Sequence, residues 1–182
     1  MKITKEFEGL NRIENGDYVY EGDLISDGDI EIELDDRLIV KGKIEAKNAI
    51  TAKVSINAGC SISAGGSISA GWGISAGCSI SAGDGISAGD GISAGGSISA
   101  GWGISAGCSI SAGGSISAGD GISAGGSISA GEFIDCGKRI FAGTSVYWDS
   151  DDCDKSIKCK ELLRGDIAYG DLIEEARNET QT

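Results

Sequence analysis

The sequence predicts an all-β fold: a single-stranded parallel β-helix, or β-solenoid, with three sides and about 18 residues per coil. Three observations lead to this prediction: a six-residue repeat, an alternation of apolar and polar residues within it, and a glycine at its end. A short repeat at a fixed period is typical of folds in which each unit buries its apolar face only by stacking on copies of itself.

The repeat is x-x-Ile-Ser-Ala-Gly, and it occurs twelve times in succession from Cys60 to Gly131. The same phase continues in degraded form from Ile32 upstream to Val146 downstream, which gives 20 hexads in all. An α-helix is excluded because serine and glycine are poor helix formers, and glycine every sixth residue would destabilise it. Collagen is excluded because glycine is not at every third position and proline is absent.

The alternation within one hexad places Ile62 and Ala64 on one side of a strand and the serines on the other. We therefore expect isoleucine and alanine to line a narrow interior while the serines face water. Hexads fit either a triangular coil of 18 residues or a two-sided coil of 12. Three sides are favoured because three isoleucines and three alanines fill the interior without water. The 120 residues of the phased segment then give six or seven rungs.

The glycine that ends each strand is followed by a variable pair of residues. Where the first of the pair is Trp or Asp, the second is Gly; where the first is Cys or Gly, the second is Ser. This predicts that the variable side chains lie at corners and point outward, and that a glycine after a large or charged one adopts positive φ. The large or charged corner residues are Trp72, Asp84, Asp90, Trp102 and Asp120.

The composition excludes several classes of protein. The chain has 182 residues, 31 glycines, 40% apolar residues and a net charge of −13, so we expect one folded domain rather than a disordered chain. Nucleic acid and anionic membranes would repel it, whereas a basic protein partner would not. The N-terminus lacks the apolar core of a secretion signal and no segment is apolar enough to span a membrane. We expect a cytoplasmic protein of a bacterium or of a phage-infected cell.

The charge pattern divides the chain into three parts. Residues 1–31 form an N-terminal cap with irregular first strands, residues 32–148 the hexapeptide-repeat solenoid, and residues 149–182 an acidic C-terminal cap. Charged, non-repeating ends protect the open strand edges of a solenoid. We expect short strands within residues 17–34, a loop at 149–152, further strands at 156–160 and 166–169, and a helical turn at 172–177.

Phased segments with Gly-Asp turns, such as Gly28-Asp29-Ile30-Glu31-Ile32, resemble the bactofilin-like, polymer-forming β-solenoids of bacteria. The whole chain also resembles uncharacterised β-solenoid proteins of phages and prophages. The first resemblance implies a right-handed, three-sided helix that assembles end to end into filaments. The acidic ends depart from that pattern, and the residues themselves leave the handedness open.

Catalysis, cofactors and metals find little support in the sequence. The chain has no histidine, the usual general base near neutral pH, so we expect no enzyme activity and no cofactor. Its six cysteines contain no Cys-x-x-Cys pair, which favours free thiols over a zinc site. An 18-residue coil places Cys60 directly below Cys78, about 4.8 Å away, which fits a disulfide or a row of thiols. A single Asp per corner supplies too few ligands for calcium.

The remaining interpretation is a non-enzymatic structural or protein-interaction module, which binds a protein partner or another copy of itself as a homo-oligomer. Trp72 and Trp102 either anchor that contact or lie flat over neighbouring corners. An alternative is a small acidic, phage-type inhibitor of a basic host nuclease or defence protein. A third is an ice-binding surface made by the serine rows, although the regular repeat has no threonine. The acidic residues that could engage a basic partner are Asp149, Asp151, Asp152 and Asp154.

Overall fold

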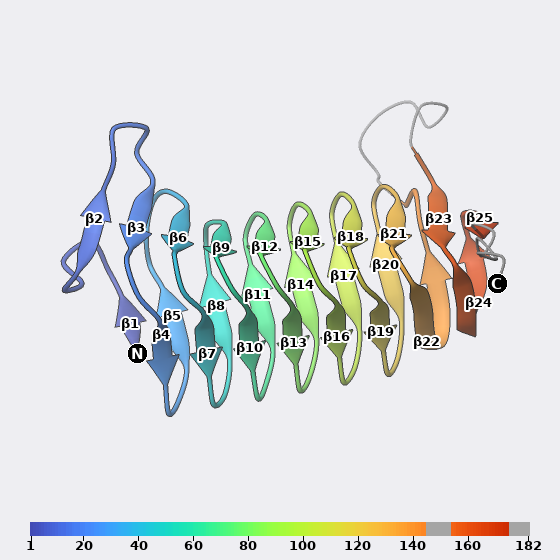
Figure 1. The fold of residues 1–182 in the computed structure, drawn as a ribbon, viewed down its shortest axis with the longest axis horizontal. Helices are drawn as coiled ribbons and strands as arrows, with labels where there is room; N and C mark the ends of the chain where they lie inside the picture. Colours follow the sequence, from blue (N-terminus) through green and yellow to red (C-terminus); the bar gives the residue numbers. More distant parts are fainter. Residues whose placement is uncertain (145–153, 175–182) are drawn as a thin grey trace, which may run out of the picture.

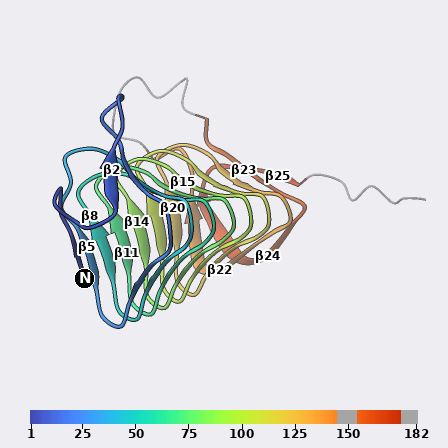
Figure 2. The ribbon, with the colours of Figure 1, turned by 60° about the vertical axis from the view of Figure 1, so that its left-hand side comes forward.

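The computed structural model describes residues 1–144 and 154–174, and it confirms the predicted β-solenoid (Figure 1). The described residues form parallel strands at intervals of about 18 residues, with no helix among them, in about eight turns. The number of turns exceeds the six or seven expected because strands outside the phased segment also join the coils. Figure 2 shows the coils stacked behind one another along the rod.

The strands form three faces, each crossed once in every coil. Face 1 contains β2 (Leu10–Arg12), β3 (Tyr18–Tyr20), β6 (Leu38–Val40), β9 (Ile56–Ala58), β12 (Ile74–Ala76), β15 (Ile92–Ala94), β18 (Ile110–Ala112), β21 (Ile128–Ala130), β23 (Ser156–Cys159) and β25 (Asp171–Glu174). Face 2 contains β4 (Leu24–Ser26), β7 (Ile44–Ala46), β10 (Ile62–Ala64), β13 (Ile80–Ala82), β16 (Ile98–Ala100) and β19 (Ile116–Ala118). Face 3 contains β1 (Lys2–Ile3), β5 (Ile30–Ile32), β8 (Ile50–Ala52), β11 (Ile68–Ala70), β14 (Ile86–Ala88), β17 (Ile104–Ala106) and β20 (Ile122–Ala124).

Two long strands cross a corner and so belong to two faces. β22 (Phe133–Phe141) pairs with both β19 and β20, and it therefore continues faces 2 and 3. β24 (Glu161–Tyr169) pairs with β22 in the last coil, with irregular register.

The interior is the predicted double ladder of isoleucine and alanine. Ile74 of β12 is the register partner of Ile92 of β15, and Ala76 is the partner of Ala94. Every isoleucine of the twelve perfect repeats is at most 1% exposed, and every alanine at most 6%. Burying one isoleucine side chain contributes about 1.5–3 kcal/mol. The same favourable term therefore recurs three times per coil.

The glycine that ends each strand is required by close stacking of the coils. A Cβ placed on Gly83 or Gly101 would lie well under 3.0 Å from the carbonyl oxygen of Gly65 or Gly83, respectively, in the coil below. That obstacle is backbone and cannot rotate away. Any larger residue at these positions would push neighbouring coils apart.

The predicted positive φ at the glycine after a large corner residue is wrong. The positive-φ glycines among the described residues lie near the two ends and include none of these. Part of the pattern instead reflects packing between coils. A Cβ on Gly96, Gly114 or Gly126 would lie 2.6–2.8 Å from a serine hydroxyl of the coil below. At these three corners, the serine hydroxyl of one coil occupies the space that a side chain would take at the corner above.

The N-terminal coil is longer than the others, and this corrects the phase assigned there. Register partners in the first coils, such as Leu24 and Ile44, are 20 residues apart because the turn between β5 and β6 has two extra residues. The short strands expected within residues 17–34 are present as β3, β4 and β5. The hexad placed at Ile32 is, however, out of phase, because the strand there is β5, which begins at Ile30.

The C-terminal coil contains the strands expected at residues 156–160 and 166–169, but the predicted helical turn at 172–177 is wrong for its described part. Leu172 lies in β25 and is the register partner of Ile157 in β23. The corners of this coil are made by Gly165 and Gly170, with φ of +120° and +124°. The expected loop at 149–152 lies outside the described residues.

Candidate interaction surface

The corner residues form three rows that follow the rod, and each row is named here by one member. In every row the N–H of a corner residue donates to the carbonyl oxygen of the residue one coil below. The Trp102 row separates faces 2 and 3, the Trp72 row faces 3 and 1, and the Cys60 row faces 1 and 2. Their members are Gly66, Asp84, Trp102, Asp120 and Lys138; Trp72, Asp90, Cys108 and Gly126; and Gly42, Cys60, Cys78, Gly96 and Gly114.

Trp72 and Trp102 are the most exposed large apolar side chains of the described residues, at 67% and 70%. Such exposure is inconsistent with indoles that lie flat over the backbone, so it favours the anchor interpretation. Their spacing of 30 residues is one coil of 18 plus two hexads. It therefore places them on different corner rows, and those two rows border the same face, face 3.

Each tryptophan has an aspartate at the same corner of the next coil. The N–H of Asp90 donates to the carbonyl oxygen of Trp72 at 3.2 Å, and the N–H of Asp120 donates to that of Trp102 at 2.9 Å. Asp120 also forms an ion pair with Lys138 at 2.7 Å. Two matching combinations of an exposed indole and a carboxylate thus stand on opposite borders of face 3.

Face 3 itself carries an open trough of about 560 Å³. Its polar lining consists of serine hydroxyls in successive coils, and Phe141 of β22 contributes an aromatic ring. No ionisable side chain lines this trough, so its charge comes from the bordering corner rows. The serines that line it are Ser67, Ser69, Ser87, Ser105 and Ser123.

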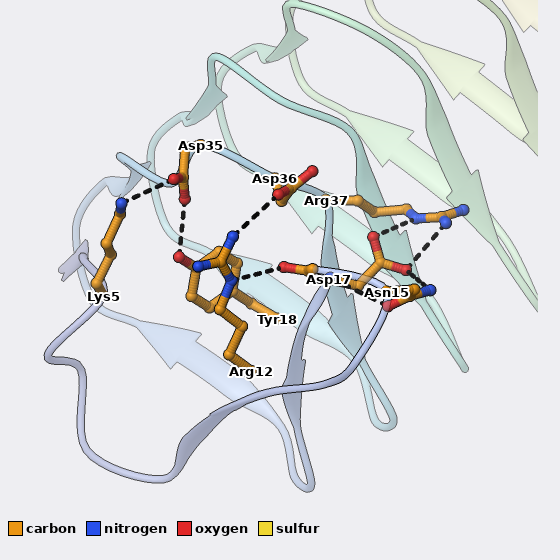
Figure 3. A network of polar contacts seen from close by, with 9 residues as sticks. Lys5, Arg12, Asn15, Asp17, Tyr18, Asp35, Asp36 and Arg37 are labelled. Carbon is orange, nitrogen blue, oxygen red and sulfur yellow. Dashed lines mark hydrogen bonds and ion pairs between the residues drawn. The ribbon is translucent and has the colours of Figure 1, made fainter.

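β2 and β3 form an antiparallel hairpin at the N-terminal end, and a polar network holds this hairpin on the first coil (Figure 3). Asp35 accepts hydrogen bonds from Lys5 Nζ and from the Tyr18 hydroxyl, each at 2.7 Å. The Lys5 and Tyr18 bonds lower the pKa of Asp35 to about 2. The bond to Asp35 in turn raises the pKa of Tyr18 above its ordinary value.

The same network buries a second carboxylate, Asp17, which is 5% exposed. Arg37 donates to both oxygens of Asp17, from Nε at 3.3 Å and Nη2 at 3.0 Å, and Asn15 adds a bond at 2.8 Å. A hollow of about 430 Å³ lies between these residues and Trp72. Sequence reasoning missed this network because its members meet only through the longer first coil.

The acidic residues predicted to bind a partner are mostly outside the described chain. Three of them, Asp149, Asp151 and Asp152, lie outside the described residues. Asp154 is exposed, and hydrogen bonds from Ser156 lower the pKa of its carboxyl. The structure places Asp154 just before β23, and it belongs to neither tryptophan row.

The last coil exposes apolar side chains that the sequence analysis did not single out. Leu163, Tyr169, Leu172 and Ile173 are 39–47% exposed. The sequence does contain a signal for this surface. Adjacent apolar pairs such as Leu162-Leu163 and Leu172-Ile173 break the alternation, so at least one side chain of each pair must point outward.

Within residues 1–144 and 154–174, no group of three or more Cys, Asp or Glu side chains is placed to hold a metal ion. No helix in this part of the chain has the length and apolar character that crossing a membrane needs. No protein-family model matches the chain, and neither does any curated protein or solved structure.

Proposed function

We propose that the protein is a non-enzymatic interaction module that binds a basic protein partner through the two corner rows bordering face 3. The observation that carries this proposal is the exposure of Trp72 and Trp102, at 67% and 70%, on opposite borders of one face. Tryptophan is enriched among the residues that contribute most to binding at protein interfaces. Isolated exposed indoles on a surface of serine and glycine are suited to that role.

The partner is expected to be basic because of what surrounds the indoles. Asp90 follows Trp72 in its row, and Asp84 and Asp120 flank Trp102. An indole beside a carboxylate suits the guanidinium of an arginine, which combines cation–π attraction with a charge-assisted hydrogen bond. The net charge of −13 would also accelerate encounter with a basic surface.

The inhibitor alternative is a narrower form of this proposal, in which the basic partner is a host nuclease or defence protein. It requires that binding block the partner's own nucleic-acid surface. Affinity should then fall steeply with added salt, and partner activity should fall as the complex forms. Binding that leaves the partner's activity unchanged would rule out the inhibitor and leave the general proposal standing.

The test replaces both indoles and compares the proteins captured. Immobilised wild-type protein and the Trp72→Ser/Trp102→Ser variant are incubated with lysate of the source cell, and captured proteins are quantified by mass spectrometry. We expect basic proteins to be enriched on the wild type and lost from the variant. Equal capture by both proteins would contradict the proposal.

A matched control separates an anchor from any exposed apolar residue. Ile25 is 50% exposed and lies in β4, at the N-terminal end of face 2, several coils from Trp102 and on a face that the Trp72 row does not border. The Ile25→Ser variant should retain the captured proteins. Light scattering on all three proteins detects self-association, and an assembly lost only in the double variant would identify a second copy as the occupant instead.

A further inference from the structure

The cysteines of the described chain occupy two kinds of environment. Cys136 and Cys159 are buried, and burial raises the pKa of each thiol. The Sγ of Cys136 also donates to the carbonyl oxygen of Asp120 at 3.1 Å. Cys60 and Cys78, in contrast, are exposed free thiols at a corner. Only the second kind is accessible to a ligand from solution.

Cys60 and Cys78 occupy the same position in consecutive coils. The N–H of Cys78 donates to the carbonyl oxygen of Cys60 at 3.1 Å, and the strands on either side pair in register. Neighbouring coils of a sheet lie about 4.8 Å apart, so parallel side chains place the two sulfurs at about that separation. Zinc–thiolate bonds are about 2.3 Å long, and two metal–sulfur bonds of similar length in line would span about 4.6 Å, close to the coil spacing.

The corner residues directly below and above the pair are glycines. Below Cys60 the row continues with Gly42, and above Cys78 it continues with Gly96. Neither glycine has a side chain to fill the space beside the two thiols. The Asp23 carboxylate near Gly42 already accepts the N–H of Lys43 at 2.8 Å.

We propose that Cys60 and Cys78 form a two-coordinate site for a soft monovalent metal ion of the copper(I) type, bound across two coils. Thiolates select soft ions, whereas zinc requires four ligands that this corner does not supply. On binding, the two S–H bonds lose their protons to solvent and two metal–sulfur bonds form. No electron is transferred, because the ion binds in its reduced state. The site is independent of the tryptophan rows.

The test titrates the reduced, full-length protein with copper(I) in the absence of oxygen, against a coloured copper(I) chelator as competitor. We expect one tightly held equivalent per chain, lost in both Cys60→Ser and Cys78→Ser. The control is Cys108→Ser, which removes a cysteine of the Trp72 row and should leave that equivalent in place. Zinc(II) at the same concentration should not displace the copper.

Three results would overturn the proposal. One is a tight equivalent that survives either single replacement in the Cys60 row. Another is its loss in Cys108→Ser to the same extent. The third is copper binding that doubles the mass in light scattering, because the ion would then join thiols of two chains. Air oxidation before titration provides a further check, since an intrachain disulfide between Cys60 and Cys78 would abolish binding only until reductant is added.

Discussion

In the central coils from β9 to β21, the same contacts recur in every coil, whereas at the N-terminal end each polar contact occurs once. The central strands pair in uninterrupted register, with Ile and Ala inward and Ser outward. The N-terminal end is held by Lys5, Arg12, Asp17 and their partners. Stability of the rod should therefore be close to a sum of equal coil-to-coil terms, while the end depends on unique side chains.

The two regions also differ in how far their stability depends on ionised side chains. Residues 56–131 carry three acidic residues and no basic ones. At the N-terminal end, by contrast, two buried or strongly bonded carboxylates, Asp17 and Asp35, connect the hairpin to the first coil. Changes of pH should consequently act on the end and leave the centre unchanged. Changes of side-chain volume should instead destabilise the centre more than the N-terminal end.

The largest expected effect is a cavity in the central ladder. Ile92 of β15 is 1% exposed, and the Ile92→Ala variant should lose about 2–5 kcal/mol of unfolding free energy. The neighbouring Ser93→Ala change points outward and should alter it by less than about 0.5 kcal/mol. Chemical unfolding followed by circular dichroism measures both. Similar losses for the two variants would contradict the assigned interior.

The next effect concerns the two glycines on either side of Trp102. A Cβ on Gly101 would collide with the backbone of Gly83, so Gly101→Ala should cost about 1–3 kcal/mol. A Cβ on Gly103 would lie 3.3 Å from the carbonyl oxygen of Gly121, and serine occupies the equivalent position at Ser67. Gly103→Ser should therefore be much milder in the same unfolding assay. Equal costs would mean that coil stacking does not explain the repeat glycine.

The smallest effect is confined to the N-terminal end and depends on pH. Because Asp35 has a pKa of about 2, below its value in the unfolded chain, it stabilises the end above pH of about 4. That contribution should be lost as pH falls from about 4 towards 2. Hydrogen-exchange protection factors should then decrease in β3 but not in β15. Asp35→Asn should lower β3 protection at neutral pH and remove the pH dependence.

The sequence was sufficient to predict the central fold and several strands of the ends, but not how the two end coils are built. Alternation of Ile and Ser fixes which face of each strand is buried, and the glycine at every sixth residue marks the corner. By contrast, the two extra residues between β5 and β6 and the strand β25 follow from contacts between distant, non-repeating residues. Positive φ is the wrong reason for the glycines that follow large corner residues, such as Gly103. The close backbone contact between coils at the repeat glycines, such as Gly101, is not visible in a local sequence pattern.

The candidate surface was predictable only in part. Trp72 and Trp102 stood out because a large aromatic residue on a glycine-rich corner has nothing local to cover. Their position on two borders of one face follows only once the coil length is known. The polar network around Asp17 and Asp35 gave no sequence signal, since its members are ordinary charged residues.

Coil length is the central claim, and a distance between two outward residues on face 3 tests it directly. Thr51 and Ser123 are connected by four successive register pairs, through Ser69, Ser87 and Ser105. Nitroxide labels are attached at Thr51→Cys and Ser123→Cys in a protein whose native cysteines are replaced. Double electron–electron resonance should then report a distance between the labels of about 19 Å, or four coil spacings. A two-sided coil of 12 residues would separate the same positions by six spacings, about 29 Å, and that result would contradict the three-sided solenoid.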